Sequence, residues 1–329
     1  MKAVIPCAKK EESLFPFIES KPTALMPVAG KPIIKHMIAD LQDIGVDDIY
    51  IVTNYLEDKF FEEFDEFTNV NLITQEELNG TGGAVEACNF IEDDFLVVNG
   101  DVIASKDDIG SLIDKHENKD SDVTVLATEE RKPEKFGVFS IENDRITSLE
   151  EKPEDPENTL VNTGIYVFTP EIFSKLEEME GEKSLADAVG GMIEEKDGRF
   201  EFVSDYWIDI GSPKKLWKAD QVKREYLIDE TDISDDAEVH ETAVIDGKAR
   251  IEKDVEIKPN TVIEGKVFIG EGSVIGPNTT VRDSSINSYS QLRACDLESS
   301  VLFEKNVMDP STFVENCIIG EDSEVKSGS

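Results

Sequence analysis

Two acidic residues each follow a short apolar run, at the point where a strand would end. Asp101 closes the segment FLVVNGD at 95–101, and Asp209 lies in WIDIG at 207–211. Protein sites for Mg²⁺ use one or two carboxylates together with phosphate oxygens of a ligand. The pair could therefore hold a magnesium ion against nucleotide phosphates, although residues 99–101 taken alone also fit an Asn-Gly turn closed by an aspartate.

The segment TQEELNGTGGA at 74–84 carries groups that could recognise a nucleotide. Gln75 offers an amide that can pair with the edge of a base. Gly80 and Thr81 open the next predicted helix, where the backbone can approach a base or ribose closely. A glycine turn with Thr81 as the helix cap explains the same residues without a ligand.

The triplet EKP at 151–153 combines an acceptor with a cation. Glu151 can accept hydrogen bonds from sugar hydroxyls, and Lys152 is suited to a sugar phosphate. The chain has 72 Asp and Glu against 33 Lys and Arg, so such a triplet also fits an ordinary exposed turn.

Alternating strand and helix patterns must position these groups as far as residue 228. Apolar, β-branched runs predict strands at 3–5, 49–52, 70–73, 95–98, 123–126 and 165–168, and helical spacing predicts helices at 33–41, 170–179, 185–194 and 213–226. This order predicts an α/β domain with a doubly wound, mostly parallel sheet. In such sheets ligands bind beyond the carboxyl ends of the strands.

From Ile233 the period of the sequence changes to six. Nine aliphatic residues stand six apart without a break: Ile233, Val239, Ile245, Ile251, Ile257, Ile263, Ile269, Ile275 and Val281. Beyond Val281 the spacing slips between five and six. The pattern resembles the hexapeptide repeat of the left-handed parallel β-helix, and we expect that domain over 229–329 after an α/β domain over 1–228. An antiparallel β-domain would instead show period-two alternation and hairpin turns.

Motifs in seven segments carry a family resemblance. KPTALMPVAGK at 21–31 is similar to the stretch that follows the catalytic loop of sugar-1-phosphate nucleotidylyltransferases, and it precedes the segments at 74–84, 95–101, 136–141, 151–153, 161–168 and 206–216 in the family's order. The resemblance implies a nucleotidyltransferase that acts on glucose-1-phosphate-like substrates with UTP or dTTP. It implies that Asp101 and Asp209 bind Mg²⁺ and that Gln75, Gly80 and Thr81 bind the nucleotide. It also implies that the sugar phosphate is bound by Gly137, Glu151, Lys152, Asn162 and Thr163.

The loop after the first strand departs from that family. Its form LAAGxGTRLRPLT falls on Pro6–Ile18, which reads PCAKKEESLFPFI. Lys9 and Glu11 replace the two glycines, Ser13 and Phe15 replace the two arginines, and Thr23 replaces a lysine of the following KPK. Glycines let backbone N–H groups surround phosphates, and losing a group that stabilises the transition state typically slows catalysis ~10²–10³-fold. We therefore expect no phosphate cradle here.

The formal charge of −39 exceeds what solubility requires and favours a salt-rich surrounding in which charges are screened. Nucleic acid and anionic membranes are poor partners for such a surface. No apolar run approaches the length of a membrane span, so we expect a cytoplasmic protein.

The four cysteines, Cys7, Cys88, Cys295 and Cys317, form no CxxC pair, which favours reduced, buried thiols. His240 lies in an early coil of the predicted β-helix without a second histidine nearby, which argues against an acyltransferase base. The last repeat lies close to Ser329 and leaves a coil edge that we expect a partner chain, or residues missing from the sequence, to cover.

Three functions remain open. The first is an active enzyme that converts an NTP and a sugar 1-phosphate into an NDP-sugar and pyrophosphate. The second, which the degenerate loop favours, is a catalytically impaired subunit that binds NDP-sugar and regulates or scaffolds an active paralogue in a homo- or hetero-oligomer. The third is a purely structural partner, against which the retained acidic and EKP residues argue.

Overall fold

The computed structural model describes residues 1–46, 48–65 and 67–328. The chain forms two compact units: Met1–Leu25 with Ile33–Asp209, and Met26–Pro32 with the chain from Ile210 onward. Helix α7 (Pro213–Leu227) ends one residue before the boundary that we predict between residues 228 and 229. This boundary stays a prediction about which segments fold independently.

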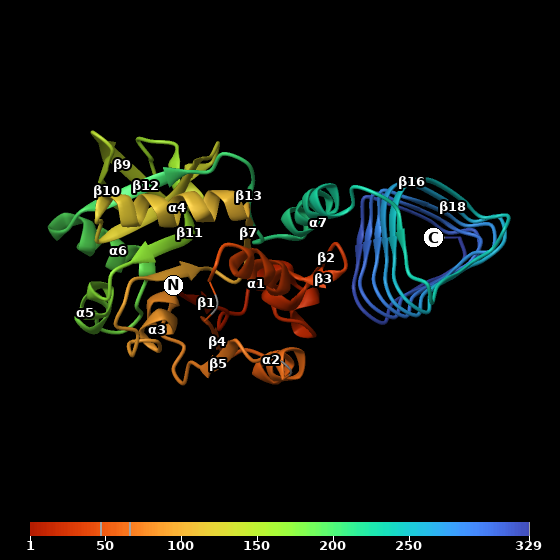
Figure 1. Cartoon of the computed structure of the whole chain (residues 1–329), viewed down its shortest axis with the longest axis horizontal. Coiled ribbons are helices and arrows are strands. Elements are labelled where there is room, and N and C mark those ends of the chain that lie inside the picture. Colours follow the sequence, from red (N-terminus) through yellow and green to blue (C-terminus); the bar gives the residue numbers. More distant parts are fainter. Residues whose placement is uncertain (47, 66, 329) are drawn as a thin grey trace. The chain divides into compact units, whose positions relative to one another are not determined.

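The first unit is built on a mixed sheet whose centre is parallel (Figure 1). Strand β1 (Lys2–Pro6) lies between β4 (Asp48–Thr53) and β6 (Phe95–Val98), and β5 (Val70–Thr74) continues the sheet beyond β4, all in parallel. β11 (Leu160–Phe168) runs antiparallel to β6 and to β8 (Val123–Glu129), and β12 (Gly198–Phe202) pairs in parallel with β8. The predicted α/β sheet is confirmed.

Helices cover both faces of this sheet because successive strand residues point to opposite sides. Ala3 and Ile5 pack with apolar residues of α1 (Ile33–Asp43), α2 (Glu57–Phe64) and α4 (Lys106–Lys119). Val4 packs on the other face with α3 (Thr81–Glu86), α5 (Glu171–Glu177) and α6 (Leu185–Glu195). Both layers are fully apolar at their centres, which is the doubly wound arrangement.

Some elements escaped the sequence patterns. α4 buries little apolar surface, with Ile109 and Leu112 as its main core residues, so its helical period is weak. A hairpin of β9 (Gly137–Glu142) and β10 (Arg145–Glu151) extends the sheet at one edge. Short strands β7 (Val102–Ala104) and β13 (Trp207–Asp209) form a separate antiparallel pair.

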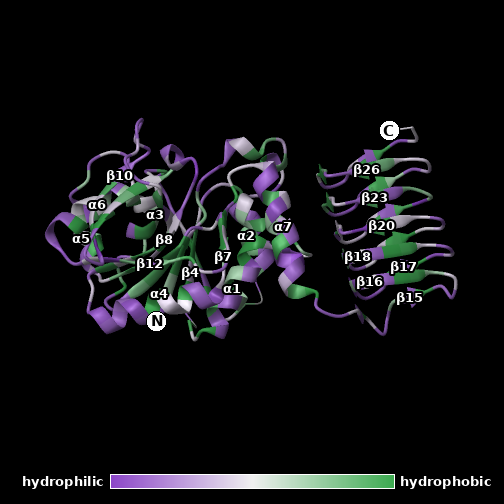
Figure 2. Cartoon of the chain, turned by 90° about the horizontal axis from the view of Figure 1, so that it is seen from above, coloured by the Kyte–Doolittle hydropathy of each residue, from purple (hydrophilic) through white to green (hydrophobic). Residues whose placement is uncertain are grey.

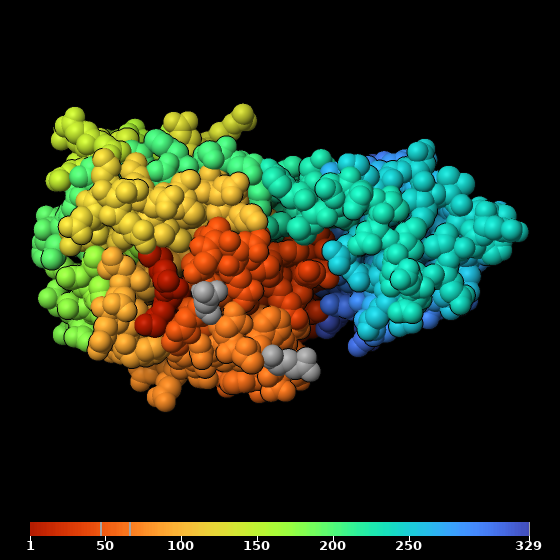
Figure 3. Space-filling model, in the orientation of Figure 1, coloured from red at the N-terminus to blue at the C-terminus, as the bar shows by residue number. Residues whose placement is uncertain are grey.

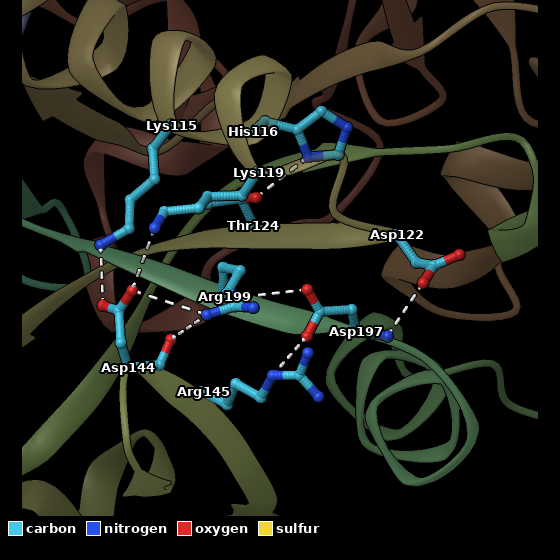
Figure 4. Close-up of polar contacts among 9 residues, drawn as sticks. All are labelled: Lys115, His116, Lys119, Asp122, Thr124, Asp144, Arg145, Asp197 and Arg199. Carbon is cyan, nitrogen blue, oxygen red and sulfur yellow. Dashed lines mark hydrogen bonds and ion pairs between the residues drawn. The ribbon is translucent and has the colours of Figure 1, made fainter.

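A cluster of ion pairs ties α4 to β12 and to the β9–β10 turn (Figure 4). Arg199 contacts Asp144 and Asp197, and Lys115 also reaches Asp144. Arg145 pairs with Asp197 at 3.0 Å. These contacts replace apolar packing on a face where the sequence offers few apolar side chains.

A hollow of about 480 Å³ opens at the amino end of β1, lined by Met1, Lys2, Gly45, Asp48, Asp93 and Asp94. Figure 3 views the molecule from this side, and the first residues of the chain, in dark red, lie set back from the surface around them. The hollow lies at the opposite end of the strands from the residues that follow β1 and β6.

The second unit is a parallel β-helix, and Figure 2 shows its stacked coils with apolar strands. Val239 pairs with Ile257 and Ile257 with Ile275, so each coil there contains three hexapeptides. The later pairs, Ile275 with Leu292 and Leu292 with Met308, are 17 and 16 residues apart by their numbers, which reflects the slipped spacing. The repeat residues from Ile251 to Val314 form its buried core. The predicted β-helix is confirmed.

The strands of the β-helix are short apart from two. They are β14 (Asp232–Ile233), β15 (Glu238–Val239), β16 (Val244–Ile251), β17 (Glu256–Ile257), β18 (Val262–Ile269), β19 (Val274–Ile275), β20 (Thr280–Arg282), β21 (Ser285–Ile286), β22 (Gln291–Leu292), β23 (Asp296–Glu298), β24 (Val301–Leu302), β25 (Val307–Met308), β26 (Phe313–Glu315), β27 (Ile318–Ile319) and β28 (Glu324–Val325).

Helix α7 and a small hairpin of β2 (Pro27–Val28) and β3 (Lys31–Pro32) belong to the same unit. The backbone N–H of Ala29 donates to Asp220 at 2.8 Å, and Asp220 also holds the buried Arg224. Arg224 in turn donates to the carbonyl of Lys266 on β18 at 2.6 Å. A segment that follows the degenerate loop in sequence is thereby packed with α7 and the β-helix.

Candidate functional site

The β7–β13 pair brings Asp101 and Asp209 together. Asp209 lies opposite Val102 in this pair, and Asp101 immediately precedes Val102. Burial and then the charge of Asp209 raise the pKa of Asp101 to about 6. Two strands far apart in sequence thus place two carboxylates in one electrostatic neighbourhood, as the resemblance implies.

The degenerate loop starts beside this carboxylate pair. The N–H of Gly100 donates to the carbonyl of Pro6 at 3.1 Å, and a Cβ on Gly100 would overlap the Cys7 sulfur. Burial and then the nearby Asp101 raise the pKa of the Cys7 thiol. The carboxyl ends of β1 and β6 therefore meet where the predicted phosphate loop begins.

The loop closes on itself through two 3₁₀ turns, Glu12–Leu14 and Phe17–Glu19. Three of its N–H groups find partners inside the loop: Ser13 donates to the Glu11 side chain, Leu14 to the Glu11 carbonyl and Phe15 to the Glu12 carbonyl. Glu11, at a position that the resemblance assigns to glycine, is the N-cap of the first turn. These N–H groups are used by the loop itself and do not form an anion cradle.

Lys9 and Lys10 each form an ion pair with a glutamate. The Lys9 ammonium lies 3.2 Å from Glu11, and burial lowers its pKa less than Glu11, Asp101 and Asp209 raise it, so that the pKa of Lys9 lies above its usual value. Lys10 pairs with Glu19 at 2.8 Å and lies over the Tyr55 ring. Lys9 thus adds a positive charge near the two carboxylates, where a metal ion would also bind.

Thr23, at the position of the missing lysine, is buried in the turn Thr23–Leu25. Its hydroxyl has no hydrogen-bond partner. A side chain that is short and enclosed cannot extend a charge into a neighbouring site.

Gln75 is fixed by hydrogen bonds from its own amide. Its Nε2 donates to Asn79 Oδ1 at 2.8 Å and to the Gly80 carbonyl at 3.3 Å. Gly80 has φ +99, and a Cβ on Gly83 would overlap Asn79 Oδ1, so the glycines are required for this close fit. Because both amide hydrogens are engaged, the Gln75 group that can recognise a ligand is the acceptor Oε1. Asn79 was missed by the sequence patterns, although its Asn-Gly pair is a turn signal.

The predicted sugar residues gather around the β9–β10 pair. Glu151 lies opposite Gly137, and a Cβ on Gly137 would come within 3.0 Å of Glu151 Oε2. Lys152, in a left-handed conformation with φ 47, pairs with Glu151 at 3.1 Å. Asn162 accepts from the N–H of Gly164 at 3.0 Å and lies beside Gly137.

Thr163 is placed differently from its neighbours. Its hydroxyl donates to the carbonyl of Leu126 at 2.6 Å, and its side chain is buried. Its side chain therefore braces β11 against β8 in this structure, and a sugar contact by Thr163 stays a prediction.

Asn99 is a candidate that the sequence patterns missed. Its N–H donates to the Gly164 carbonyl at 3.0 Å, and its amide occupies the space that a Cβ on Gly164 would fill. Its Oδ1 is buried without a hydrogen-bond partner. A buried acceptor without a donor is costly, so this oxygen suits a hydroxyl donor from a ligand.

The carboxylate pair fits Mg²⁺, which binds through one or two carboxylates plus ligand phosphates and waters. Asp101 and Asp209 would hold the ion, which would neutralise charge on phosphate oxygens. Over residues 1–46, 48–65 and 67–328, no group of three His, Cys, Asp or Glu side chains is arranged to hold a metal. Two carboxylates alone would leave most coordination positions to phosphate and water.

The remaining sequence expectations concern isolated residues. Cys7, Cys88 and Cys295 are buried free thiols, but Cys317 is exposed, so the expectation of four buried cysteines is wrong at that position, where its coil turns toward solvent. His240 is exposed and contacts Thr242. Within the part of the chain that the structure describes, no helix has the length and apolar character needed to cross a bilayer.

Comparisons with known proteins agree with these observations. Residues 10–225 match the nucleotidyl transferase family, and residues 248–283 match the bacterial transferase hexapeptide repeats. The chain is 35% identical over 259 residues to the bifunctional protein GlmU of Methanocaldococcus jannaschii, covering 77% of this chain and 60% of that protein. It thus spans about 60% of the length of the first GlmU relatives.

A relative of similar length comes from Haloferax volcanii. The low-salt glycan biosynthesis nucleotidyltransferase Agl11 is 30% identical over 343 residues, covering 99% of this chain and 94% of that protein.

Two solved structures resemble the chain. A Bacillus anthracis protein described as a glucose-1-phosphate thymidylyltransferase aligns with a TM-score of 0.63 and 28% identity, over 68% of this chain and 96% of that one. A UDP-glucose pyrophosphorylase from Acinetobacter baumanii aligns with a TM-score of 0.59 over 69% of this chain and 94% of that one, and at 20% identity it supports the fold alone. Family match, relatives and fold agree with the motifs, and the chain belongs to the nucleotidyl transferase family, followed by a hexapeptide-repeat β-helix.

Proposed function

We propose that the first unit binds a nucleoside diphosphate sugar without efficient transfer chemistry, and that the chain regulates or scaffolds an active paralogue in an oligomer. The closed loop after β1 carries this proposal. The N–H groups of Ser13, Leu14 and Phe15 donate within the loop, so they are not available to a triphosphate. The arginines and the lysine that would stabilise charge on the reacting phosphorus are absent.

Retained groups support binding. Gln75 Oε1, an acceptor, suits the N3–H of uracil or thymine, whereas cytosine and adenine present an acceptor at that edge. Glu151 and Asn162 lie together beside Gly137, where they suit sugar hydroxyls. Asp101 and Asp209 suit Mg²⁺ bound to the diphosphate. A purely structural partner would have no need of these groups.

An active enzyme is the second candidate, and one observation favours it. Lys9 lies in the electrostatic field of Asp101 and Asp209, and a flexible lysine can bind phosphate as a point charge. In this case NTP and sugar 1-phosphate would give NDP-sugar and pyrophosphate, by attack of the sugar phosphate on the α-phosphorus.

Two measurements on the purified protein in high salt separate these candidates. The first is pyrophosphate release from UTP or dTTP with glucose 1-phosphate and Mg²⁺, and the second is calorimetry with UDP-glucose and dTDP-glucose. We expect binding without pyrophosphate release. Turnover comparable to that of an intact-loop transferase would establish the enzyme instead, and absence of heat with both sugar nucleotides would leave only the structural role.

Matched variants locate the binding. Glu151→Gln removes one charge beside Gly137, and Glu150→Gln makes the same change one residue earlier, where the side chain points to the other face of β10. We expect weaker UDP-glucose binding for Glu151→Gln and unchanged binding for Glu150→Gln. Equal effects would mean that Glu151 contributes only to the overall charge.

A further inference from the structure

The connection between α5 and α6 lies directly on the nucleotide-recognition turn, Asn79–Gly83. The N–H of Lys183 donates to the Asn79 carbonyl at 2.6 Å, and the N–H of Gly82 donates to the Lys183 carbonyl at 2.8 Å. The N–H of Leu185 donates to Thr81 Oγ1 at 3.2 Å. Three hydrogen bonds therefore join segments about 100 residues apart.

The glycines of this turn make room for Lys183. A Cβ on Gly80 would overlap the Lys183 carbonyl oxygen, and a Cβ on Gly82 would lie 2.8 Å from it. The carbonyl therefore sits against the start of α3, where it accepts a helix N–H that would otherwise need another partner. The glycine-rich sequence at this turn is thus matched to a protein contact as well as to any ligand.

The Lys183 side chain makes a second contact with α3, in addition to the backbone hydrogen bonds. Its ammonium lies 2.6 and 2.7 Å from the two carboxylate oxygens of Glu86, at the end of α3. The two side chains are only 13% and 21% exposed, so salt screens this pair less than it screens a surface pair. One residue thus binds both the first and the last turn of α3.

Helix α6 continues from this contact to the strand that carries Glu151. Ser184 caps the helix by accepting from the N–H of Asp187 at 3.2 Å. A Cβ on Gly190 would lie 3.4 Å from the Leu149 carbonyl, so α6 packs against the backbone of β10. The nucleotide turn and the sugar strand are therefore both supported by one helix.

Resting on the proposed function, we propose that Lys183 is a positioning residue for the nucleobase: it holds the turn that orients Gln75 through Asn79 and Gly80. The Gln75 amide donates to Asn79 Oδ1 and to the Gly80 carbonyl, and both residues lie in the segment that Lys183 fastens. Loosening this segment frees the amide to rotate, which exchanges its donor and acceptor positions. The preference among bases then falls along with affinity.

The test compares three variants of the whole chain by calorimetry with UDP-glucose and CDP-glucose in high salt. Lys183→Met removes the ammonium, Lys183→Arg keeps the charge, and Lys175→Met removes a more exposed ion pair to Glu195, the last residue of α6. Lys183→Met loses the contact with Glu86 but keeps the backbone hydrogen bonds of residue 183. Because the last turn of α3 is then loosened, we expect UDP-glucose binding to weaken about tenfold and the preference for UDP-glucose over CDP-glucose to fall. Lys183→Arg should restore both, and Lys175→Met should change neither.

Melting temperatures and amide hydrogen exchange at Gly80–Gly83 identify a merely structural effect. General destabilisation would weaken both sugar nucleotides equally and would not be restored by arginine, which would overturn the positioning role. Affinity and preference equal to the wild type in Lys183→Met would overturn it as well. If the wild-type chain itself binds neither UDP-glucose nor dTDP-glucose, the proposed function is wrong, a result that is separate from the variant comparison.

Discussion

Single residues at the candidate site are held in states that cost stability. Asp101 keeps a half-buried carboxylate next to Asp209, Asn99 keeps an acceptor without a donor, and Lys152 adopts a left-handed backbone. Unfavourable local arrangements of this kind concentrate at binding sites, where a ligand relieves them. The family resemblance implies a metal role for Asp101 and a sugar-phosphate role for Lys152, and the structure adds Asn99 as a further candidate.

Replacing Asp101 by asparagine should stabilise the chain above pH 6. The pKa of Asp101 is about 6 when folded and about 3.9 when unfolded, so the folded state binds the extra proton. Stability from this group is therefore present at low pH and is lost as pH rises from about 4 through 6. We expect Asp101→Asn to melt a few degrees above the wild type at pH 8 and to match it at pH 4, by differential scanning calorimetry.

The exposed Asp155→Asn serves as the control for net charge. A gain of the same size in Asp155→Asn would assign the effect to overall repulsion rather than to the carboxylate pair.

At the scale of elements, α4 is fastened by polar contacts more than by apolar ones. Among them His116 is buried on the inner side of α4, with Nδ1 3.0 Å from the Thr124 hydroxyl on β8 (Figure 4). Its Nε2 lies 3.5 Å from Asp94. Burial lowers the pKa of His116 more than Asp94, Glu117 and Asp122 raise it.

The pH dependence of stability should report His116. The unfolded chain takes up a proton on this residue at higher pH than the folded chain does, so stability falls as pH falls below about 6.5. His116→Gln cannot titrate, and urea denaturation should show a flatter dependence between pH 7 and 5 than the wild type shows. His240→Gln, at an exposed position, should keep the wild-type slope, and an unchanged slope in His116→Gln would exclude this source.

The β2–β3 hairpin should be sensitive to one methyl group. Gly30 has φ +86, and a Cβ there would overlap the Phe268 ring on β18, whereas Gly45 has nearly the same φ, +84, with open space around it. Gly30→Ala should cost about 2–4 kcal/mol of unfolding free energy through backbone strain and overlap, and Gly45→Ala only about 1 kcal/mol. Urea denaturation measures both losses. Equal losses would show that the hairpin backbone shifts and avoids the overlap with the Phe268 ring.

At the scale of the whole molecule, the charge of −39 dominates. Mutual repulsion among carboxylates opposes any compact state, and at ~1 M salt the Debye length falls to roughly 3 Å. Buried pairs such as Arg224 with Asp220 are screened far less. Salt should therefore weaken the repulsion among surface carboxylates and leave the buried ion pairs intact.

Added potassium chloride should raise the melting temperature of the chain. We expect a continuous rise between about 0.1 and 2 M, measured by circular dichroism, with sucrose as the uncharged control for preferential exclusion. A melting temperature that stays constant or falls with KCl, or an equal rise with sucrose, would contradict adaptation to a salt-rich surrounding.

Much of the fold was open to prediction because it rests on local periodicity. Period six from Ile233 to Val281 requires an aliphatic residue at each face of a coil, and the pairing of Val239 with Ile257 follows from it. The strand runs before residue 228 are similarly local. α4 and the β9–β10 hairpin lie where burial is partial, and there the pattern of apolar residues is too weak to predict them.

By itself, therefore, the sequence determined the two architectures, the family and the loss of the loop's glycines and arginines, since each depends on residue types at fixed spacing. Only the tertiary structure decided that Asp101 lies near Asp209, that both carboxylates act on the charge of Lys9, and that Lys183 holds the turn beside Gln75. These are contacts between distant segments, and they depend on which strands pair and how helices pack. No local pattern records that choice, because the free energy of such contacts arises only after the chain has folded.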